Sequence, residues 1–200
     1  MDPHTTEEKG SFMPSIRVYH SFRSPYSRLG LHILAREGVE AELIPFSGPP
    51  EGVAFNDPVA NPLKLAYYMQ DAPRMTMRMG LPINPPQPFD VDLAPSYKAA
   101  VAAAGDGKGL AFALEVSDAR WGKGRDISDL SVLESCAEKA GWDKSAVGSA
   151  QNDQSVAAEM KRHRDLIAED GVFGVPFAVM GPKKYWGHDR FGLLVDDLKD

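Results

Sequence analysis

The stretch Phe22-Arg23-Ser24-Pro25-Tyr26-Ser27 decides the fold. It ends a run from Ile16 to Phe22 in which apolar and aromatic residues alternate, as they do in a strand. Proline is favoured in the first turn of a helix, and serine is a preferred residue just before that turn. We therefore expect a strand that leads into a helix, with the Ser24 hydroxyl at the helix N-terminus.

The residues that follow complete a strand–helix–strand unit. Apolar side chains recur at helical spacing from Pro25 to Glu37, and Gly38 is typical of the position just past a helix end. A second apolar run, from Ala41 to Phe46, is predicted to be a strand.

A second informative stretch, Gly171-Val172-Phe173-Gly174-Val175-Pro176-Phe177-Ala178-Val179, lies near the C-terminus. Pro176 has no N–H to donate, and the bond before it is a candidate for the cis form. The run from Phe177 to Met180 and the pair Tyr185-Trp186 are predicted to form a hairpin, followed by a helix from Asp189 to about Leu198.

From Gly48 to Pro95 prolines and glycines interrupt the chain, and Pro82 to Pro88 is predicted to be an extended loop. Asn61 to Ala168 is interpreted as an inserted helical domain. The expected helices are Ser96 to Ala104, Gly109 to Trp121, a helix opened by Asp126-Ile127-Ser128-Asp129 that runs to about Ala140, and Gln151 to Ala168. Met75, Met77 and Met79 are interpreted as core residues, with an adaptable apolar pocket as the alternative.

Composition restricts the classes of partner. The chain has 200 residues, 43% apolar and 25% charged, with a net charge of -6, which is typical of a soluble globular protein and argues against nucleic acid as the main partner. The basic cluster Lys161, Arg162, His163 and Arg164 is interpreted as a solvated helix face, with a phosphate site as the alternative. No apolar run approaches membrane-spanning length, so no membrane partner is expected.

The chain contains a single cysteine, Cys136. An intramolecular disulfide and a Cys-x-x-Cys pair are therefore impossible, which excludes a dithiol oxidoreductase. Cys136 falls on a helical apolar pattern and is interpreted as a small buried hydrophobe rather than a reactive thiol. We expect a protein of the reducing cytoplasm.

The sequence resembles the 2-hydroxychromene-2-carboxylate isomerases and the kappa-class glutathione transferases, within the DsbA-like group. The resemblance spans about Ile16 to Leu198. Its motifs, in the family's order, are Ser24-Pro25-Tyr26, Asn61-Pro62-Leu63-Lys64 followed by Tyr68 and Asp71, Gly80-Leu81-Pro82, Gly124-Arg125-Asp126-Ile127-Ser128-Asp129, Gly174-Val175-Pro176, and Trp186-Gly187-His188-Asp189-Arg190.

This resemblance implies an α/β fold in which a thioredoxin-like core, β-α-β followed by ββα, carries a large helical domain inserted between its halves. Residues 14–56 and 170–200 would form the thioredoxin-like domain and residues 57–169 the inserted domain, with residues 1–13 as a flexible N-terminus.

The resemblance also implies glutathione as the cofactor, bound in the groove between the core and the insertion. Ser24 would be the catalytic residue, because a hydroxyl donor at a helix N-terminus favours the thiolate of a thiol whose pKa is ordinarily about 8.5. Val175, preceding Pro176, would pair its backbone with the cysteinyl backbone of glutathione. Two alternatives stay open: Ser24 as a plain helix cap, and a cis proline kept for folding alone.

The remaining cofactor contacts follow from the same resemblance. Asp189 would meet the γ-glutamyl ammonium group, with a plain helix cap as the alternative. His188 stands where the family usually has serine, asparagine or glutamine, so its glutamyl contact is expected to differ. Lys64 would pair with the glycine carboxylate, and Asn56 is the candidate for a supporting amide. No metal site is expected.

The implied activity is a glutathione-dependent cis–trans isomerisation of an aromatic unsaturated keto acid through reversible thiolate addition. Arg23 and Tyr26 are candidates for binding this small-molecule substrate, and a homodimer is expected. Two alternatives use the same fold: a kappa-type glutathione S-transferase, and a non-catalytic ligand-binding protein. His188 and Phe177, which follows the proline where the family commonly has threonine, keep the last of these open.

Overall fold

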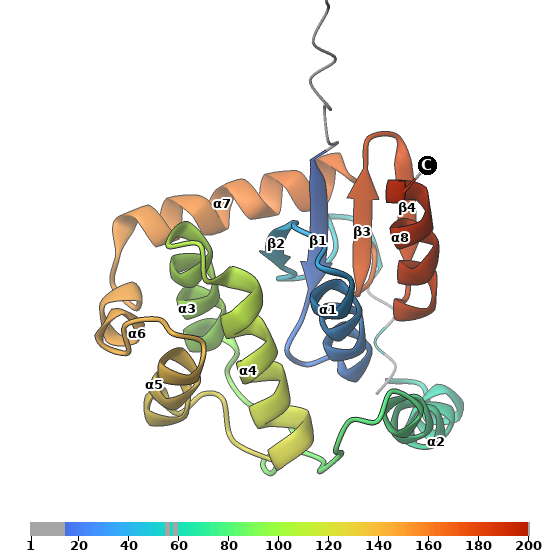
Figure 1. The fold of residues 1–200 in the computed structure, drawn as a ribbon, viewed down its shortest axis with the longest axis horizontal. Helices are drawn as coiled ribbons and strands as arrows, with labels where there is room; N and C mark the ends of the chain where they lie inside the picture. The colour runs from blue at the N-terminus through green and yellow to red at the C-terminus, as the bar shows by residue number, and fades with distance from the viewer. Residues whose placement is uncertain (1–14, 55–56, 58–59, 200) are drawn as a thin grey trace, which may run out of the picture.

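The computed structural model describes residues 15–54, 57 and 60–199. Residues 1–13 and Asn56 therefore lie outside the described residues. The described chain contains a sheet with the strand order β2-β1-β3-β4 (Figure 1). Strand β1 runs parallel to β2 and antiparallel to β3, and β3 runs antiparallel to β4. The strand bounds are β1 Ile16–His20, β2 Glu42–Pro45, β3 Phe177–Met180 and β4 Lys183–Trp186.

Helices follow β1, fill the middle of the chain and close it. Helix α1 lies between β1 and β2, and the final helix α8 follows β4 through the short 3-10 helix η2. The bounds are α1 Pro25–Glu37, α2 Pro62–Arg78, α3 Ala94–Gly105, α4 Gly109–Lys123, α5 Leu130–Lys139, α6 Ser145–Ala150, α7 Gln154–Glu169, η2 His188–Arg190 and α8 Phe191–Lys199.

The sheet separates two apolar clusters, because successive side chains of a strand point to opposite faces. On β1, Val18 joins the cluster that contains α1 and α8, whereas Tyr19 joins the cluster that contains the end of α7. Strand β3 alternates in the same way, with Ala178 on the first face and Phe177 on the second. Figure 1 shows α1 and α8 together on one face of the sheet.

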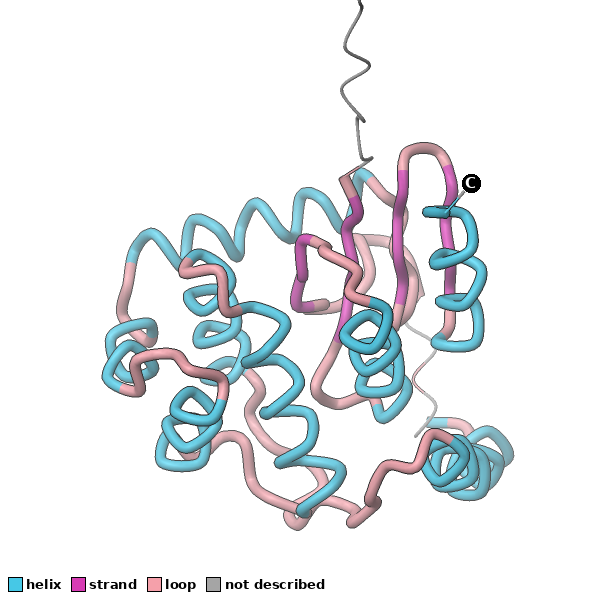
Figure 2. Tube along the Cα trace, viewed as in Figure 1, coloured by secondary structure: helices cyan, strands magenta, loops and turns pink. Residues whose placement is uncertain are grey.

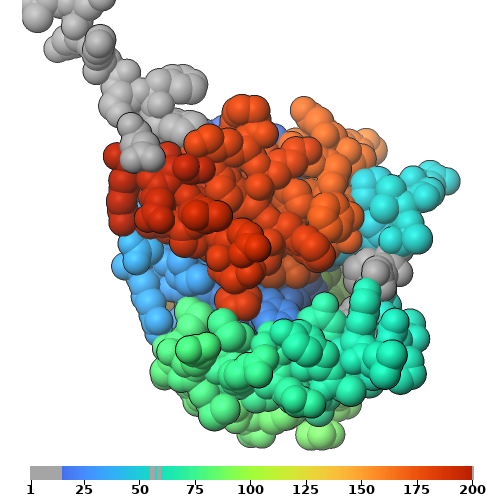
Figure 3. Space-filling view, turned by 90° about the vertical axis from the view of Figure 1, so that its right-hand side faces the viewer, coloured from blue at the N-terminus to red at the C-terminus, as the bar shows by residue number. Residues whose placement is uncertain are grey.

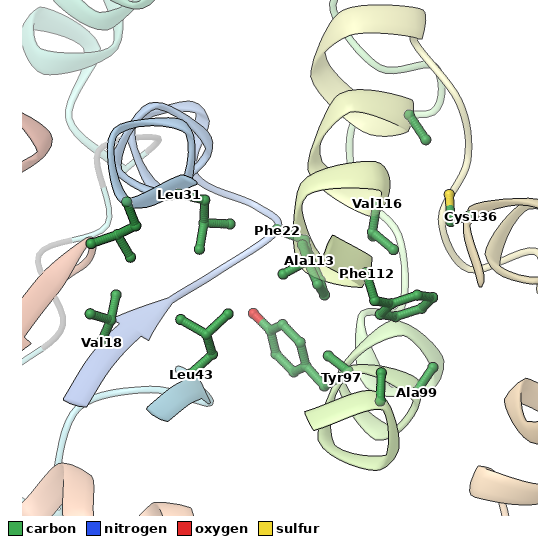
Figure 4. Close-up of a cluster of buried hydrophobic side chains, with 14 of the residues drawn as sticks. Val18, Phe22, Leu31, Leu43, Tyr97, Ala99, Phe112, Ala113, Val116 and Cys136 are labelled. Carbon is green, nitrogen blue, oxygen red and sulfur yellow. The ribbon is translucent and has the colours of Figure 1, made fainter. Parts of the chain in front are cut away.

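The larger cluster continues from the sheet into the helical insertion. It runs from Val18 and Leu31 through Phe112 to Cys136 on α5 (Figure 4). Cys136 is only 2% exposed, and burial raises the pKa of its thiol to about 11. Its interpretation as a buried hydrophobe is therefore confirmed.

The strand–helix–strand unit, the hairpin and the final helix are confirmed. The Val175–Pro176 peptide bond is cis. The prediction of one helix from Gln151 to Ala168 was wrong in one respect, because α6 ends at Ala150 and α7 starts at Gln154. Asp153 caps α7, and its carboxylate accepts from the backbone N–H of Ser155 at 2.7 Å. An aspartate at that position favours a new helix start over a continuous helix.

Helix α2 was not predicted. Its internal proline, Pro73, indicates a break when the sequence is considered alone. Figure 2 shows α2 set apart from the other helices, with loops on either side. Its buried residues are Ala72 and Thr76. The interpretation of the three methionines as core residues is wrong, because Met77 is 63% exposed and the other two are only partly buried.

The basic cluster on α7 is a mainly exposed face, as predicted, except that His163 is buried. Arg162 there pairs with Glu159 and Glu42. None of the helices in the described part of the chain combines the length and hydropathy that crossing a membrane requires.

Candidate active site

Ser24 occupies the N-cap position of α1. Its backbone is extended, with φ -97° and ψ 116°, and its Oγ accepts a hydrogen bond from the Ser27 N–H at 3.1 Å. A hydroxyl that accepts this bond still has its own proton to donate. Capping and donation to a ligand are therefore compatible roles for Ser24, and the half-buried side chain lies where the helix dipole favours negative charge.

The cis-proline loop lies at the same end of the sheet as Ser24. Tyr19 on β1 pairs with Phe177 on the antiparallel β3, so the turn after β1 and the residues before β3 share one edge. The Pro176 carbonyl accepts from the Gly187 N–H at 2.9 Å. Within the described residues, the backbone N–H and C=O of Val175 make no hydrogen bond, which leaves one rung available to an extended ligand.

Tyr26, His188 and Asp71 join α1, η2 and α2. The rings of Tyr26 and His188 are stacked with centroids 5.2 Å apart, and the Tyr26 hydroxyl donates to Asp71 Oδ2 at 2.6 Å. Burial and the Asp71 hydrogen bond raise the pKa of Tyr26, and the same bond holds the pKa of Asp71 below its ordinary value. The Tyr26 hydroxyl, expected to bind substrate, is thus already used to hold α2.

The His188 side chain is buried against the Tyr26 ring, and its Nε2 has no hydrogen-bond partner among the described residues. Burial lowers the pKa of His188, so its ring is predominantly neutral at neutral pH. A neutral ring nitrogen can donate to or accept from a ligand, according to its tautomer.

The two charged groups expected to hold the ends of glutathione are Asp189 and Lys64. Asp189 lies in η2, is exposed, and pairs with the neighbouring Arg190 at 2.7 Å. Lys64 lies in the first turn of α2, partly buried, and no carboxylate of the described residues lies within ion-pair distance of it. Asn61 caps this helix, accepting from the backbone N–H groups of Leu63 and Lys64.

A hollow on the molecular surface separates the C-terminal residues, which include η2, from α2 and the loop after it. Figure 3 shows the C-terminal residues above it, α2 and the following loop below it, and residues of the N-terminal quarter at its floor. The expected groove between the thioredoxin-like core and the insertion is therefore present.

Two buried arginines beside this region were missed by the sequence analysis. Arg28 on α1 donates to Asp118 at 2.6 Å and to the Pro82 carbonyl at 2.7 Å. Arg120 on α4 donates to the Phe89 carbonyl at 2.6 Å. Their sequence signal is weak, because a charged residue on a helix is normally exposed.

Arg23, expected near the substrate, projects from the same turn as Ser24 and is partly exposed. It approaches Asp57 and Asp90 at 3.8 Å each. The structure thus gathers Ser24, Arg23 and the Val175–Pro176 loop at one end of the sheet.

Two other hollows lie away from this end. One of about 710 Å³ lies at the N-terminal end of β1, between Glu37–Glu42 and α8. The other, of about 500 Å³, reaches Glu42, Glu159 and His163. Side chains of these three residues could approach a common ion, but the Arg162 guanidinium pairs with both carboxylates.

Comparison with known proteins gives one family and a consistent set of relatives. The family model of the DSBA-like thioredoxin domain matches residues 15–199. A 2-hydroxychromene-2-carboxylate isomerase of Sphingobium xenophagum is 29% identical over 197 residues, which cover 93% of this chain and 98% of that protein.

Solved structures share the fold at lower identity. A 2-hydroxychromene-2-carboxylate isomerase superposes with a TM-score of 0.72 at 22% identity, covering 92% of this chain and 94% of that one. A probable DsbA oxidoreductase from Streptomyces coelicolor also has a TM-score of 0.72, at 19% identity, covering 93% of this chain and 88% of that one. The thioredoxin-like fold is therefore established, and the fold alone does not choose between these activities.

Proposed function

The chain belongs to the DSBA-like thioredoxin domain family, and we propose that it is a glutathione-dependent cis–trans isomerase of an aromatic unsaturated keto acid. The match to the 2-hydroxychromene-2-carboxylate isomerase of Sphingobium xenophagum covers 93% of this chain and 98% of that protein, which supports the proposal. The observation that carries the proposal is the Ser24 hydroxyl, which caps α1 yet keeps its proton to donate.

The residues of the groove fit a small thiol peptide. The Val175 backbone, which makes no hydrogen bond to a described residue, suits the cysteinyl residue. Lys64, which pairs with no carboxylate of the described residues, suits a carboxylate. Asp189 and the orphaned Nε2 of His188 lie together in η2 and suit the ammonium and carboxylate of a γ-glutamyl group. Asn56, outside the described residues, keeps its predicted role as a supporting amide.

Glutathione bound here would supply a thiolate that adds reversibly to the substrate double bond, so that rotation and elimination give the trans product. Ser24 donates a hydrogen bond to the sulfur, and the N-terminus of α1 stabilises negative charge there. Both effects favour the thiolate over the thiol. Val175 and Pro176 hold the peptide backbone, and Arg23 places a positive charge beside the same turn.

The test is calorimetric titration with reduced glutathione, together with the ultraviolet absorbance of the bound thiolate as a function of pH. We expect saturable binding and a bound thiol whose pKa lies below its ordinary value of about 8.5. Ser24→Ala should return that pKa towards 8.5 and lower isomerase activity on 2-hydroxychromene-2-carboxylate about 100-fold, as loss of a single transition-state donor does.

Two control variants separate capping from chemistry. Ser24→Gly keeps most of the capping free energy but lacks the hydroxyl, so it should lose as much activity as Ser24→Ala. Asp129→Ala removes the exposed cap of α5 and should leave the thiol pKa and the activity unchanged. Absence of glutathione binding at millimolar concentration would contradict the proposal. A stable conjugate that consumes glutathione would identify a transferase instead.

We also propose that the enzyme is a cytoplasmic homodimer, as its family resemblance implies. Sedimentation equilibrium and cell fractionation test these two statements.

A further inference from the structure

Arg120 is a buried cation that lacks a counter-ion. Its side chain is 1% exposed, and its one hydrogen bond within the described residues joins Nη2 to the Phe89 carbonyl. Nε and Nη1 have no partner, and no carboxylate of the described chain lies within ion-pair distance. Leaving a buried charge uncompensated destabilises a protein by several kcal/mol.

Arg28 is a buried guanidinium in the same molecule whose charge is paired with a carboxylate. It is as deeply buried as Arg120, yet it pairs with Asp118 at 2.6 Å and also donates to the Pro82 carbonyl. The two arginines therefore differ in having or lacking a carboxylate. That difference indicates that the partner of Arg120 comes from outside the described residues.

The charged groups around Arg120 do not serve as this partner. The Asp126 carboxylate already accepts from the N–H and hydroxyl of Ser128. Asp90 is 83% exposed and approaches Arg23 instead. Burial, and then the nearby Arg23, lower the pKa of Arg120, so the surrounding carboxylates do not offset the cost of burying its charge.

Arg120 lies next to the turn that presents Ser24. Its neighbour Trp121 donates through Nε1 to the Phe22 carbonyl at 2.9 Å, directly before Arg23 and Ser24. Tyr97, which also interacts electrostatically with Arg120, shares a 2.7 Å hydrogen bond with Ser21 at the start of the same turn.

The surroundings of Arg120 are aromatic. The rings of Phe89 and Trp121 meet edge to face with centroids 6.2 Å apart, and the Arg120 guanidinium carbon lies 5.6 Å from the Trp121 ring centre. The Phe22 and Tyr97 rings lie 5.8 Å apart on the side of the turn. Aromatic walls around a guanidinium suit a planar acid, whose ring packs while its carboxylate takes two N–H groups.

We propose that Arg120 binds the carboxylate of an aromatic acid substrate through its free N–H donors, with Arg23 as a second positive charge at the entrance. This inference rests on the proposed function for the identity of the substrate. Arg120 is 1% exposed and its Nη2 donates to the Phe89 carbonyl, so the loop between α2 and α3 has to shift when the acid binds.

The test compares a charged and an uncharged probe that share one shape, cinnamate and methyl cinnamate, by calorimetric titration. Wild type should bind cinnamate at least tenfold more tightly than the ester, and cinnamate should raise its melting temperature. Arg120→Gln should lose at least tenfold in cinnamate affinity while ester affinity and glutathione affinity stay unchanged. Arg164→Gln, at an exposed position on α7, is the matched control and should change none of these values.

Two further variants guard against a folding defect. Arg120→Lys keeps the charge but not the fork of donors, so it should recover part of the cinnamate affinity lost in Arg120→Gln. Arg23→Gln, at a partly exposed position, should weaken cinnamate about threefold to tenfold without affecting the fold. Wild-type cinnamate affinity in folded Arg120→Gln, or equal affinity for acid and ester in wild type, would overturn the inference.

The outcomes also separate this inference from the proposed function. Cinnamate binding that needs Arg120, in a protein that ignores glutathione, would support the carboxylate subsite and contradict the isomerase. Glutathione binding without any preference for the acid would overturn the subsite alone.

Discussion

Helices α1 and α2 start in the same way and are held in opposite ways. Each begins with a proline directly after a polar cap, Ser24 in α1 and Asn61 in α2. Six residues of α1 are buried, and Gly30 packs so tightly that a Cβ there would lie 2.9 Å from the Phe191 ring. In α2 only Ala72 and Thr76 are buried, whereas large apolar side chains are exposed, namely Leu63, Tyr67, Met69 and Met77.

The two sides of the hollow therefore differ in how firmly they are packed against the core. The Ser24 hydroxyl, which we propose as the catalytic group, comes from the side that the core holds in place, where small positional errors would be costly to catalysis. Lys64, which we assign to ligand binding, comes from the side attached by a few polar links, among them Tyr26 to Asp71 and Arg36 to the Met79 carbonyl. We expect α2 to adapt to the ligand while α1 stays fixed.

The largest expected difference is in the free energy of unfolding after matched leucine truncations. Leu29→Ala leaves a cavity beneath α1 and should cost about 2–5 kcal/mol. Leu63→Ala, at a position 84% exposed on α2, should change stability by less than about 0.5 kcal/mol. Urea denaturation measures both, and equal losses would show that α2 is anchored as firmly as α1.

A smaller difference is expected when the two caps are removed. Ser24→Ala should lower the global stability by about 1 kcal/mol, because α1 unfolds with the core. Asn61→Ala removes the acceptor for Leu63 and Lys64, and should speed amide exchange within α2 while the urea midpoint stays the same. A shift of the urea midpoint in Asn61→Ala as large as in Ser24→Ala would contradict local opening of α2.

The smallest effect is expected at the link between the helices, and it depends on pH. The Tyr26 hydroxyl holds the folded-state pKa of Asp71 below its ordinary value. At pH values above the ordinary pKa of an aspartate, the link stabilises the attachment of α2 in full. This contribution is lost as the pH falls below that ordinary value and through the lower pKa of folded Asp71. Tyr26→Phe should remove under about 1 kcal/mol at neutral pH and abolish this part of the acid sensitivity.

Amide exchange of α2 across that pH range measures this effect. Arg36→Gln weakens a second attachment of α2 that has no carboxylate partner, so it should speed exchange equally at both ends of the range. Identical pH profiles for wild type and Tyr26→Phe would show that the Tyr26–Asp71 contact contributes nothing.

Local patterns predicted the core better than the insertion. The turn at Ser24, the cap at Gly38 and the cis proline at Pro176 each rest on a few adjacent residues, and all are observed. Helix α2 was missed because Pro73 lies inside it and because prolines and glycines recur from Gly48 to Pro95, which argues against a continuous helix in the sequence alone.

The candidate site was predictable where it depends on sheet topology. Ser24 and Val175 come together because β1 and β3 are neighbours, which the family resemblance implied. Arg28 and Arg120 were not predictable, because burial of a guanidinium depends on residues far along the chain. Asp118 lies 90 positions from Arg28, and no spacing rule connects them.

The burial of Cys136 makes it practical to label α2 with a fluorophore and to follow its movement. Because its thiol is buried and weakly acidic, a cysteine placed on the surface would be the one site that a thiol-reactive dye labels in the folded protein. Leu63→Cys would put a fluorophore on α2 without first replacing the native Cys136. Its signal would report in real time how that helix responds to each ligand.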